Sequence, residues 1–238
     1  MSSNTDPQQL FASMSTFVTA CMANHDPSHN PAHVHRVVSL ARRILQAEQL
    51  LSSTSYDPTT VNLAALLHDI GDRKYVTHVA EAAGGNDDAL DPKKMVKHAL
   101  LAHGADEGLA EKVQTIVSHV SYTTECADPA KVKELIAGGY PELAIVQDAD
   151  RLDAIGAVGI GRCFTFLGAQ GQKFVAKGAA WEMGNSIEHF GDKLERLEGM
   201  MKTQTGWKMA KVRTERLREF RSWWEEEVSL ASTYDIQQ

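Results

Sequence analysis

Apolar residues recur every three or four positions along almost the whole chain, which is the spacing of one face of an α-helix. Alternating runs of Val, Ile and Thr bounded by turn residues, the pattern of a half-buried strand, are scarce. The pattern therefore predicts an all-α fold, a single multi-helix bundle with little or no sheet. The predicted helices cover residues 6–24, 33–49, 57–70, 93–103, 107–121, 141–157, 185–203 and 205–230.

One of these predicted helices is apolar nearly all round. Residues 61–67 read VNLAALL, the composition of a central helix that is buried on most sides. Pro58 suits its first turn, and Gly71 is a natural stop. The helix ends in His68 and Asp69, so two side chains that can bind a metal lie at the end of an otherwise buried segment.

Composition and charge narrow the class of protein. Of the 238 residues 43% are hydrophobic, so the chain can bury a sizeable core. The formal net charge of -7 argues against a general nucleic-acid binder, which needs a basic face. Three cysteines are too few for a disulfide framework, and no apolar run approaches the roughly 20 residues of a membrane span. We expect a cytoplasmic protein that binds neither nucleic acid nor membrane.

The polar pair at the end of the buried helix needs a partner, because an imidazole and a carboxylate are costly to bury alone. A divalent cation satisfies both. The dipeptide is not diagnostic by itself, and we interpret His25-Asp26 as a chance occurrence of it. The preceding helix adds support, because His33 and Arg36 are three residues apart and share a face. A metal ligand and a phosphate-binding cation would then point the same way.

Three carboxylates interrupt a later apolar segment, at Asp148, Asp150 and Asp153. So close to a core face they need a cation or a basic partner, and Arg151 is one candidate. Asp148 and Asp150 are about 200° apart around a regular helix, so they cannot easily bind the same ion. One of the two is expected to be a ligand and the other structural.

Five motifs follow one another in an order typical of a known enzyme group. They are HVHRV at 33–37, AALLHDIGDRK at 64–74, DADRLDAIGA at 148–157, GIGRCF at 159–164 and SIEHFGDKL at 186–194. This series resembles the HD-domain metal-dependent phosphohydrolases, and among them the small bacterial and fungal hydrolases that include nucleoside-triphosphate pyrophosphohydrolases. The resemblance implies an HD hydrolase domain over residues 29–220. Residues 1–28 would form a helix packed on it, and residues 221–238 a helix end and tail.

The resemblance also implies the metal ligands. They are His33, His68, Asp69 and Asp150, where Asp150 is chosen over Asp148 because the second aspartate of DxDR is the usual ligand. Two imidazoles and two carboxylates without a thiolate suit one divalent ion, with Mn²⁺ favoured and Co²⁺, Ni²⁺, Fe²⁺ or Mg²⁺ as alternatives.

Further site residues follow from the same resemblance. Asp72 would orient or deprotonate water, and Lys74 would bind phosphate. The other expected substrate contacts are Arg36, Arg151, Arg162, His189 and Lys193. One departure is visible, since relatives often have an aspartate where this chain has Asn30.

The implied reaction is the hydrolysis of a (deoxy)nucleoside triphosphate to a monophosphate and pyrophosphate. A nucleoside 5′-monophosphate phosphatase is the nearest alternative. An HD-fold di-iron oxygenase would need a second metal and extra histidines such as His98 and His119, and a non-catalytic nucleotide-binding module would keep the fold without turnover. The expected partner is a small-molecule nucleotide, and the amphipathic C-terminal helices are compatible with a homodimer.

Overall fold

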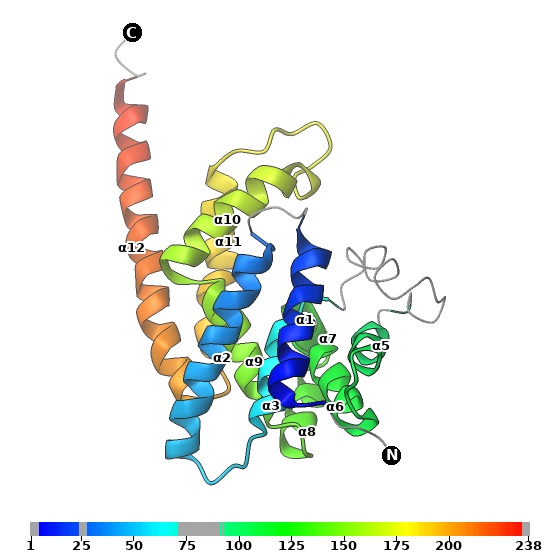
Figure 1. Cartoon of the computed structure of the whole chain (residues 1–238). Coiled ribbons are helices and arrows are strands. Elements are labelled where there is room, and N and C mark those ends of the chain that lie inside the picture. The colour runs from blue at the N-terminus through cyan, green and yellow to red at the C-terminus, as the bar shows by residue number, and fades with distance from the viewer. Residues whose placement is uncertain (1–4, 24–27, 71–90, 92, 235–238) are drawn as a thin grey trace.

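The structure is a computed structural model that describes residues 5–23, 28–70, 91 and 93–234. Within these residues the regular elements are helical and no strand occurs, which confirms the predicted all-α class. The helices are α1 (Pro7–Met22), α2 (Pro31–Leu51), α3 (Pro58–Leu67), α5 (Met95–Ala102), α6 (Glu107–Val117), α7 (Tyr122–Ala127), α8 (Pro129–Ala137), α9 (Glu142–Asp153), α10 (Gly156–Gln170), α11 (Gly184–Asp192) and α12 (Gln204–Tyr234) (Figure 1). Two 3₁₀ segments, η3 (Gly171–Lys173) and η4 (Leu194–Met200), adjoin α10 and α11.

Side-chain caps fix where the first helices begin. The Asn30 carboxamide oxygen accepts hydrogen bonds from two backbone N–H groups in the first turn of α2, and Pro31 occupies the first position of that helix. Asp57 and Pro58 start α3 in the same way. The capping role explains Asn30, and it holds His33, the third residue of α2, in a fixed first turn.

The core is built around α9. Every residue of α9 except Asp150 is buried, so this helix offers a single partly open position. Helix α2 packs against both α9 and α3, and α3 is buried over residues 60–61 and 63–67, as its apolar sequence predicts. The two segments that carry His33 and His68 therefore meet the segment that carries Asp150.

The prediction of one continuous helix over residues 141–157 is wrong at its C-terminal end. Helix α9 stops at Asp153, Ile155 is extended, and Gly156 adopts a left-handed φ of +75°. A Cβ at Gly156 would lie 3.0 Å from Cγ of Arg213, so glycine meets both the backbone and the packing requirement. The chain bends by 71° between α9 and the segment 156–173. The bend gives α10 a direction different from that of α9.

The predicted helix at 185–203 is also interrupted. Helix α11 ends at Asp192, Lys193 leaves helical geometry with φ -134° and ψ -56°, and η4 follows. Lys193 thus lies at the break between α11 and η4, so helical periodicity does not predict where its side chain points.

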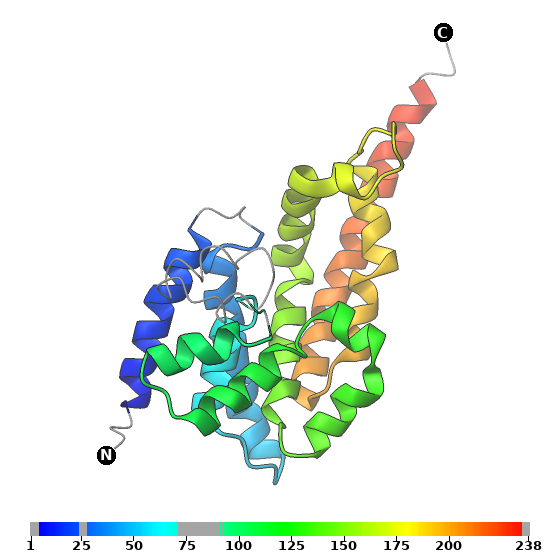
Figure 2. The same ribbon diagram turned by 90° about the vertical axis from the view of Figure 1, so that its right-hand side faces the viewer.

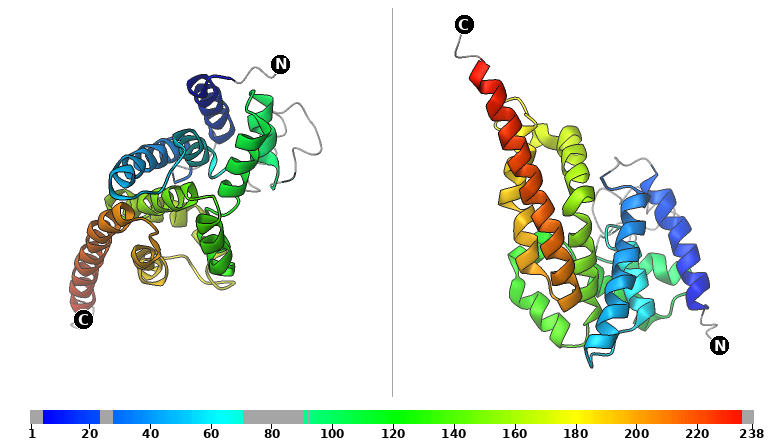
Figure 3. Two further views of the ribbon diagram at one scale, coloured as in Figure 1. Left: turned by 90° about the horizontal axis from the view of Figure 1, so that it is seen from below. Right: turned by 90° about the vertical axis from the view of Figure 1, so that its left-hand side faces the viewer.

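Helices α10, α11 and α12 lie side by side and extend beyond the rest of the bundle (Figure 2). Helices α1 and α12 lie on opposite sides of the molecule (Figure 3). Among the described residues no single helix is long and apolar enough to cross a membrane. The bent pair formed by α9 and residues 156–173 passes that test by length and composition only, and α9 is buried within the bundle.

Candidate metal centre

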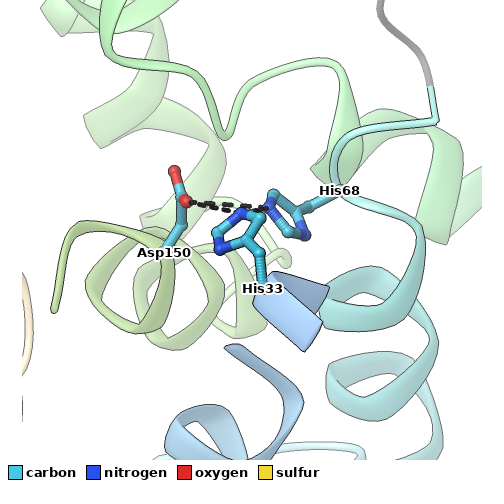
Figure 4. A group of neighbouring side chains, drawn as sticks. All are labelled: His33, His68 and Asp150. Atoms are coloured by element: carbon cyan, nitrogen blue, oxygen red, sulfur yellow. Dashed lines mark hydrogen bonds and ion pairs between the residues drawn. The ribbon is translucent and has the colours of Figure 1, made fainter. Parts of the chain in front are cut away.

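Three helices bring two imidazoles and two carboxylates together. The Nε2 atoms of His33 and His68 are 3.1 Å apart, and Oδ1 of Asp150 lies 3.7 Å from the first and 3.6 Å from the second (Figure 4). Asp69 approaches the same two atoms, with oxygens 3.5 Å from His33 Nε2 and 3.7 Å from His68 Nε2. The four predicted ligands therefore converge on one point, and the ligand atoms of His33, His68 and Asp150 all lie within 4.8 Å of one another.

Hydrogen bonds at the far side of each ring decide which nitrogen faces this point. His33 Nδ1 lies 2.7 Å from a carboxylate oxygen of Asp153, and His68 Nδ1 lies 2.9 Å from the carbonyl oxygen of Ala65. Both acceptors require a proton on Nδ1, so each Nε2 presents its lone pair inward. Two lone pairs 3.1 Å apart repel each other unless a proton or a cation lies between them.

The charges around the centre favour a cation. Burial alone would lower the pKa of His68, but the carboxylates of Asp69 and Asp150 raise it to about 9. Burial lowers the pKa of His33 despite its bond to Asp153. A proton on His68 is therefore one way to balance the carboxylates, and a divalent ion bound by both Nε2 atoms is another. This donor set, two imidazoles and two carboxylates, fits the divalent ion that the resemblance implies.

Asp153 is the residue whose role the sequence did not reveal. Its carboxylate accepts from His33 Nδ1, from Nε and an Nη of Arg36 at 2.8 and 3.0 Å, and from an Nη of Arg162 at 3.1 Å. Burial opposes ionisation, yet these donors lower the pKa of Asp153 to about 2. A carboxylate behind a ligating histidine fixes its tautomer and raises its basicity. Its place three residues after Asp150 was a usable signal, since it faces the same way.

Asp148 and Arg151, which flank Asp150 in α9, bond to other parts of the fold rather than to the metal centre. Asp148 accepts from the backbone N–H groups of Lys202 and Thr203 and from the Thr203 hydroxyl, all within 2.8 Å, so it anchors the start of α12. This agrees with the choice of Asp150 as ligand. Arg151 is not brought to the centre, because it is buried and donates to Glu125 and to the Met200 carbonyl. The expected phosphate contact from Arg151 is therefore not supported.

The remaining basic residues divide between the centre and a neighbouring cavity. Arg36 is paired with Asp153 and positions it. Arg162, His189 and Lys193 come together on the wall of one cavity of about 310 Å³. Arg162 joins this cavity to the centre, since it reaches both Asp153 and the Ser28 carbonyl.

Lys193 faces the same cavity from the break after α11. Its Nζ lies 4.8 Å from the centre of the Tyr122 ring. Burial lowers the pKa of Lys193, and the nearby carboxylate of Asp150 opposes this shift. Burial likewise lowers the pKa of His189. The cavity thus brings one imidazole and two basic side chains close to the metal centre.

Some predicted residues do not enter the described site. Asp72 and Lys74 lie outside the described residues. Within the part of the chain that the structure describes, the candidate ligand group holds no histidine other than His33 and His68. His119 is not part of this group, and its Nδ1 lies 2.8 Å from the Thr115 carbonyl oxygen. The described residues therefore show no second metal site of the kind that a di-iron oxygenase would need.

Comparisons with known proteins bear on the same residues. Residues 32–155 match the model of the family described as the HD domain, and all four predicted ligands lie in this range. The uncharacterised protein YpgQ of Bacillus subtilis is 33% identical over 198 residues, which are 83% of this chain and 83% of YpgQ.

Solved structures resemble the whole chain. The crystal structure of B. subtilis YpgQ in complex with ADP has 29% identity and a TM-score of 0.65, and the match covers 92% of this chain and 97% of that one. A protein of Lactobacillus plantarum has 26% identity and a TM-score of 0.68 with the same coverage. An HD-superfamily hydrolase of Bacillus thuringiensis, 24% identical with a TM-score of 0.62, shares the fold over 94% of this chain and 99% of its own.

Proposed function

This chain belongs to the HD domain family, and on that premise we propose that it is a divalent-metal-dependent phosphohydrolase that splits (deoxy)nucleoside triphosphates into a monophosphate and pyrophosphate. The observation that carries the proposal is the pair of inward Nε2 atoms of His33 and His68, 3.1 Å apart and faced by the carboxylates of Asp69 and Asp150. A divalent cation bound between them would satisfy all four groups at once.

The ligands and their supports hold the metal in this proposal. His33, His68, Asp69 and Asp150 bind it, and Asp153 keeps His33 in the tautomer with a proton on Nδ1. A divalent ion bound there, preferably Mn²⁺, would lower the pKa of a bound water molecule and polarise a phosphoryl oxygen of the substrate.

Other side chains act on the substrate. Arg162 and Lys193 provide positive charge on the wall that adjoins the centre, where they bind the oxygens of a polyphosphate and stabilise the charge that shifts during attack. Asp72 is proposed to orient or deprotonate the attacking water, and Lys74 to bind phosphate. Arg36 acts on the site through Asp153 rather than directly.

The choice of a nucleotide rests on two supports. YpgQ binds ADP in its crystal structure, and the match to that structure covers 92% of this chain. The cavity beside the centre is lined by the basic residues Arg162 and Lys193 and by the aromatic residues Phe166 and Phe174. The first pair suits the polyphosphate of a nucleotide and the second suits its base.

The identity of the product tests the proposal. Metal-stripped protein is incubated with Mn²⁺ and a panel of nucleoside mono- and triphosphates, and the products are resolved by anion-exchange chromatography, for the natural chain and for Asp69→Ala. Metal-dependent release of pyrophosphate from triphosphates, lost in the variant, is the expected result. Orthophosphate from monophosphates would instead identify a nucleotidase, and no turnover with any divalent metal would contradict hydrolysis.

A further inference from the structure

Two cavities adjoin each other beside the metal centre. The inner cavity, about 310 Å³, is the one that Arg162 and Lys193 line. The outer cavity, about 220 Å³, lies between the end of α10 and α11. Phe166, Phe174 and His189 line both, so the two spaces share a wall. The inner cavity is nearer the centre, because Arg162 on its wall also reaches the Asp153 carboxylate.

The charge reverses along this path. The inner cavity carries the guanidinium of Arg162 and the ammonium of Lys193, whereas the carboxylates of Glu188 and Asp192 line the outer one. A polyphosphate is attracted to the inner end and repelled from the outer end. A ligand that places its phosphates near the metal centre must therefore present an uncharged portion to the outer cavity.

The shared wall is aromatic and partly exposed. Phe174 is 65% exposed, although it lies in contact with Phe166 at a ring-centroid distance of 5.9 Å. The indole of Trp181 lines the outer cavity as well. An exposed aromatic ring at the mouth of a cavity gains from being covered by a flat apolar surface, because both faces lose contact with water.

We propose that the nucleoside of the substrate binds in this outer cavity, with its base against Phe166 and Phe174 and its sugar beside His189. The inference rests on the proposed phosphohydrolase function for the position of the phosphates. It adds the aromatic subsite, which the metal-binding residues and the phosphate contacts do not define. The three side chains that form it come from α10, from the turn after η3 and from α11.

The test separates the base from the phosphates by comparing two substrates. A nucleoside triphosphate and inorganic tripolyphosphate share the phosphate chain, but only the first carries a base. Phe174→Ala removes an exposed ring, so the fold should persist, and Trp223→Ala on α12, 53% exposed, is a matched control. Stacking of one base on one aromatic ring predicts a fall in kcat/KM of about fivefold or more for the nucleotide with Phe174→Ala. Turnover of tripolyphosphate should stay within twofold of the natural chain, and Trp223→Ala should change neither.

A binding measurement keeps the inference testable if no substrate is turned over. Calorimetric titration with AMP in the absence of metal measures nucleotide binding with no contribution from the metal, and Phe174→Ala should weaken it by a similar factor. Equal losses on nucleotide and tripolyphosphate, or AMP binding unchanged in Phe174→Ala, would overturn the aromatic subsite. Failure of hydrolysis with AMP binding retained by the natural chain and weakened by Phe174→Ala would refute the proposed function and leave the subsite standing.

Discussion

Replacing Asp153 with Asn should weaken the metal centre without touching any proposed ligand. The Asp153 carboxylate accepts four hydrogen bonds, one from His33, two from Arg36 and one from Arg162. Asparagine keeps the size of the side chain but has one oxygen and one NH₂ group. At least one of the surrounding donors then faces another donor.

The size of the effect follows from the role of the bond to His33. Without the carboxylate, the imidazole of His33 is free to place its proton on Nε2, the atom that faces the candidate centre. Changes to groups that orient a metal ligand typically cost 10- to 100-fold in metal affinity, or about 1.4 to 2.7 kcal/mol. The free energy of unfolding should also fall by about 1 to 3 kcal/mol, because buried donors lose their partner.

The assay is equilibrium binding of Mn²⁺ to metal-stripped protein in competition with a fluorescent chelator. Asp148→Asn is the matched control, since Asp148 lies on the same helix, is fully buried and accepts three hydrogen bonds from the start of α12. It should lower stability and leave Mn²⁺ affinity within about twofold, because it touches neither imidazole. Natural affinity in Asp153→Asn, or equal losses in both variants, would refute the orienting role of Asp153.

Three further predictions concern stability. Gly156→Ala should lower the free energy of unfolding in urea by about 1 to 3 kcal/mol, because its φ is +75° and its Cβ would crowd Arg213; an unchanged midpoint would contradict this. Burial alone would raise the pKa of Glu125, but its two cationic partners hold that pKa below its ordinary value. The ionised carboxylate therefore stabilises the fold above the unfolded-state pKa of about 4.3, and this stabilisation is lost as pH falls through the folded-state pKa. The free energy of unfolding of Glu125→Gln should therefore depend less on pH between about 5 and 3 than that of the natural chain. Denaturation in urea at several pH values measures this, and parallel plots of unfolding free energy against pH for the two proteins would contradict it. Mn²⁺ at 100 times its dissociation constant should stabilise the natural chain by about 2.7 kcal/mol, and chelator should reverse the gain. A thermal shift of the same size in His68→Gln would exclude this site as its origin.

The sequence predicts best what local signals determine. The starts of α2 and α3 follow from Pro31 and Pro58, which need no tertiary information. His68 ends an apolar helix and His33 lies on the buried face of its own helix, so burial alone brings both into the core. The candidate metal group accordingly contains residues that the pattern had already selected.

The sequence predicts less well what depends on packing between distant segments. Arg151 sits between two aspartates in the sequence, but its partner Glu125 comes from α7, a short helix that the apolar pattern did not predict. Arg162 reaches Asp153 from α10, and the course of α10 depends on Gly156 and the bend after α9. Lys193 faces the cavity because a helix breaks at that residue, whereas periodicity predicts continuity.

Simultaneous titration of binding and activity tests the central claim most directly. Mn²⁺ is added in steps to metal-stripped protein, and bound metal and released pyrophosphate are measured in the same samples, for the natural chain and for His68→Gln. The account predicts that both quantities saturate together at one ion per chain, and that the variant shows neither. Stoichiometric binding or full activity in His68→Gln, or activity that appears only with a second bound ion, would contradict a single centre built on His33, His68, Asp69 and Asp150.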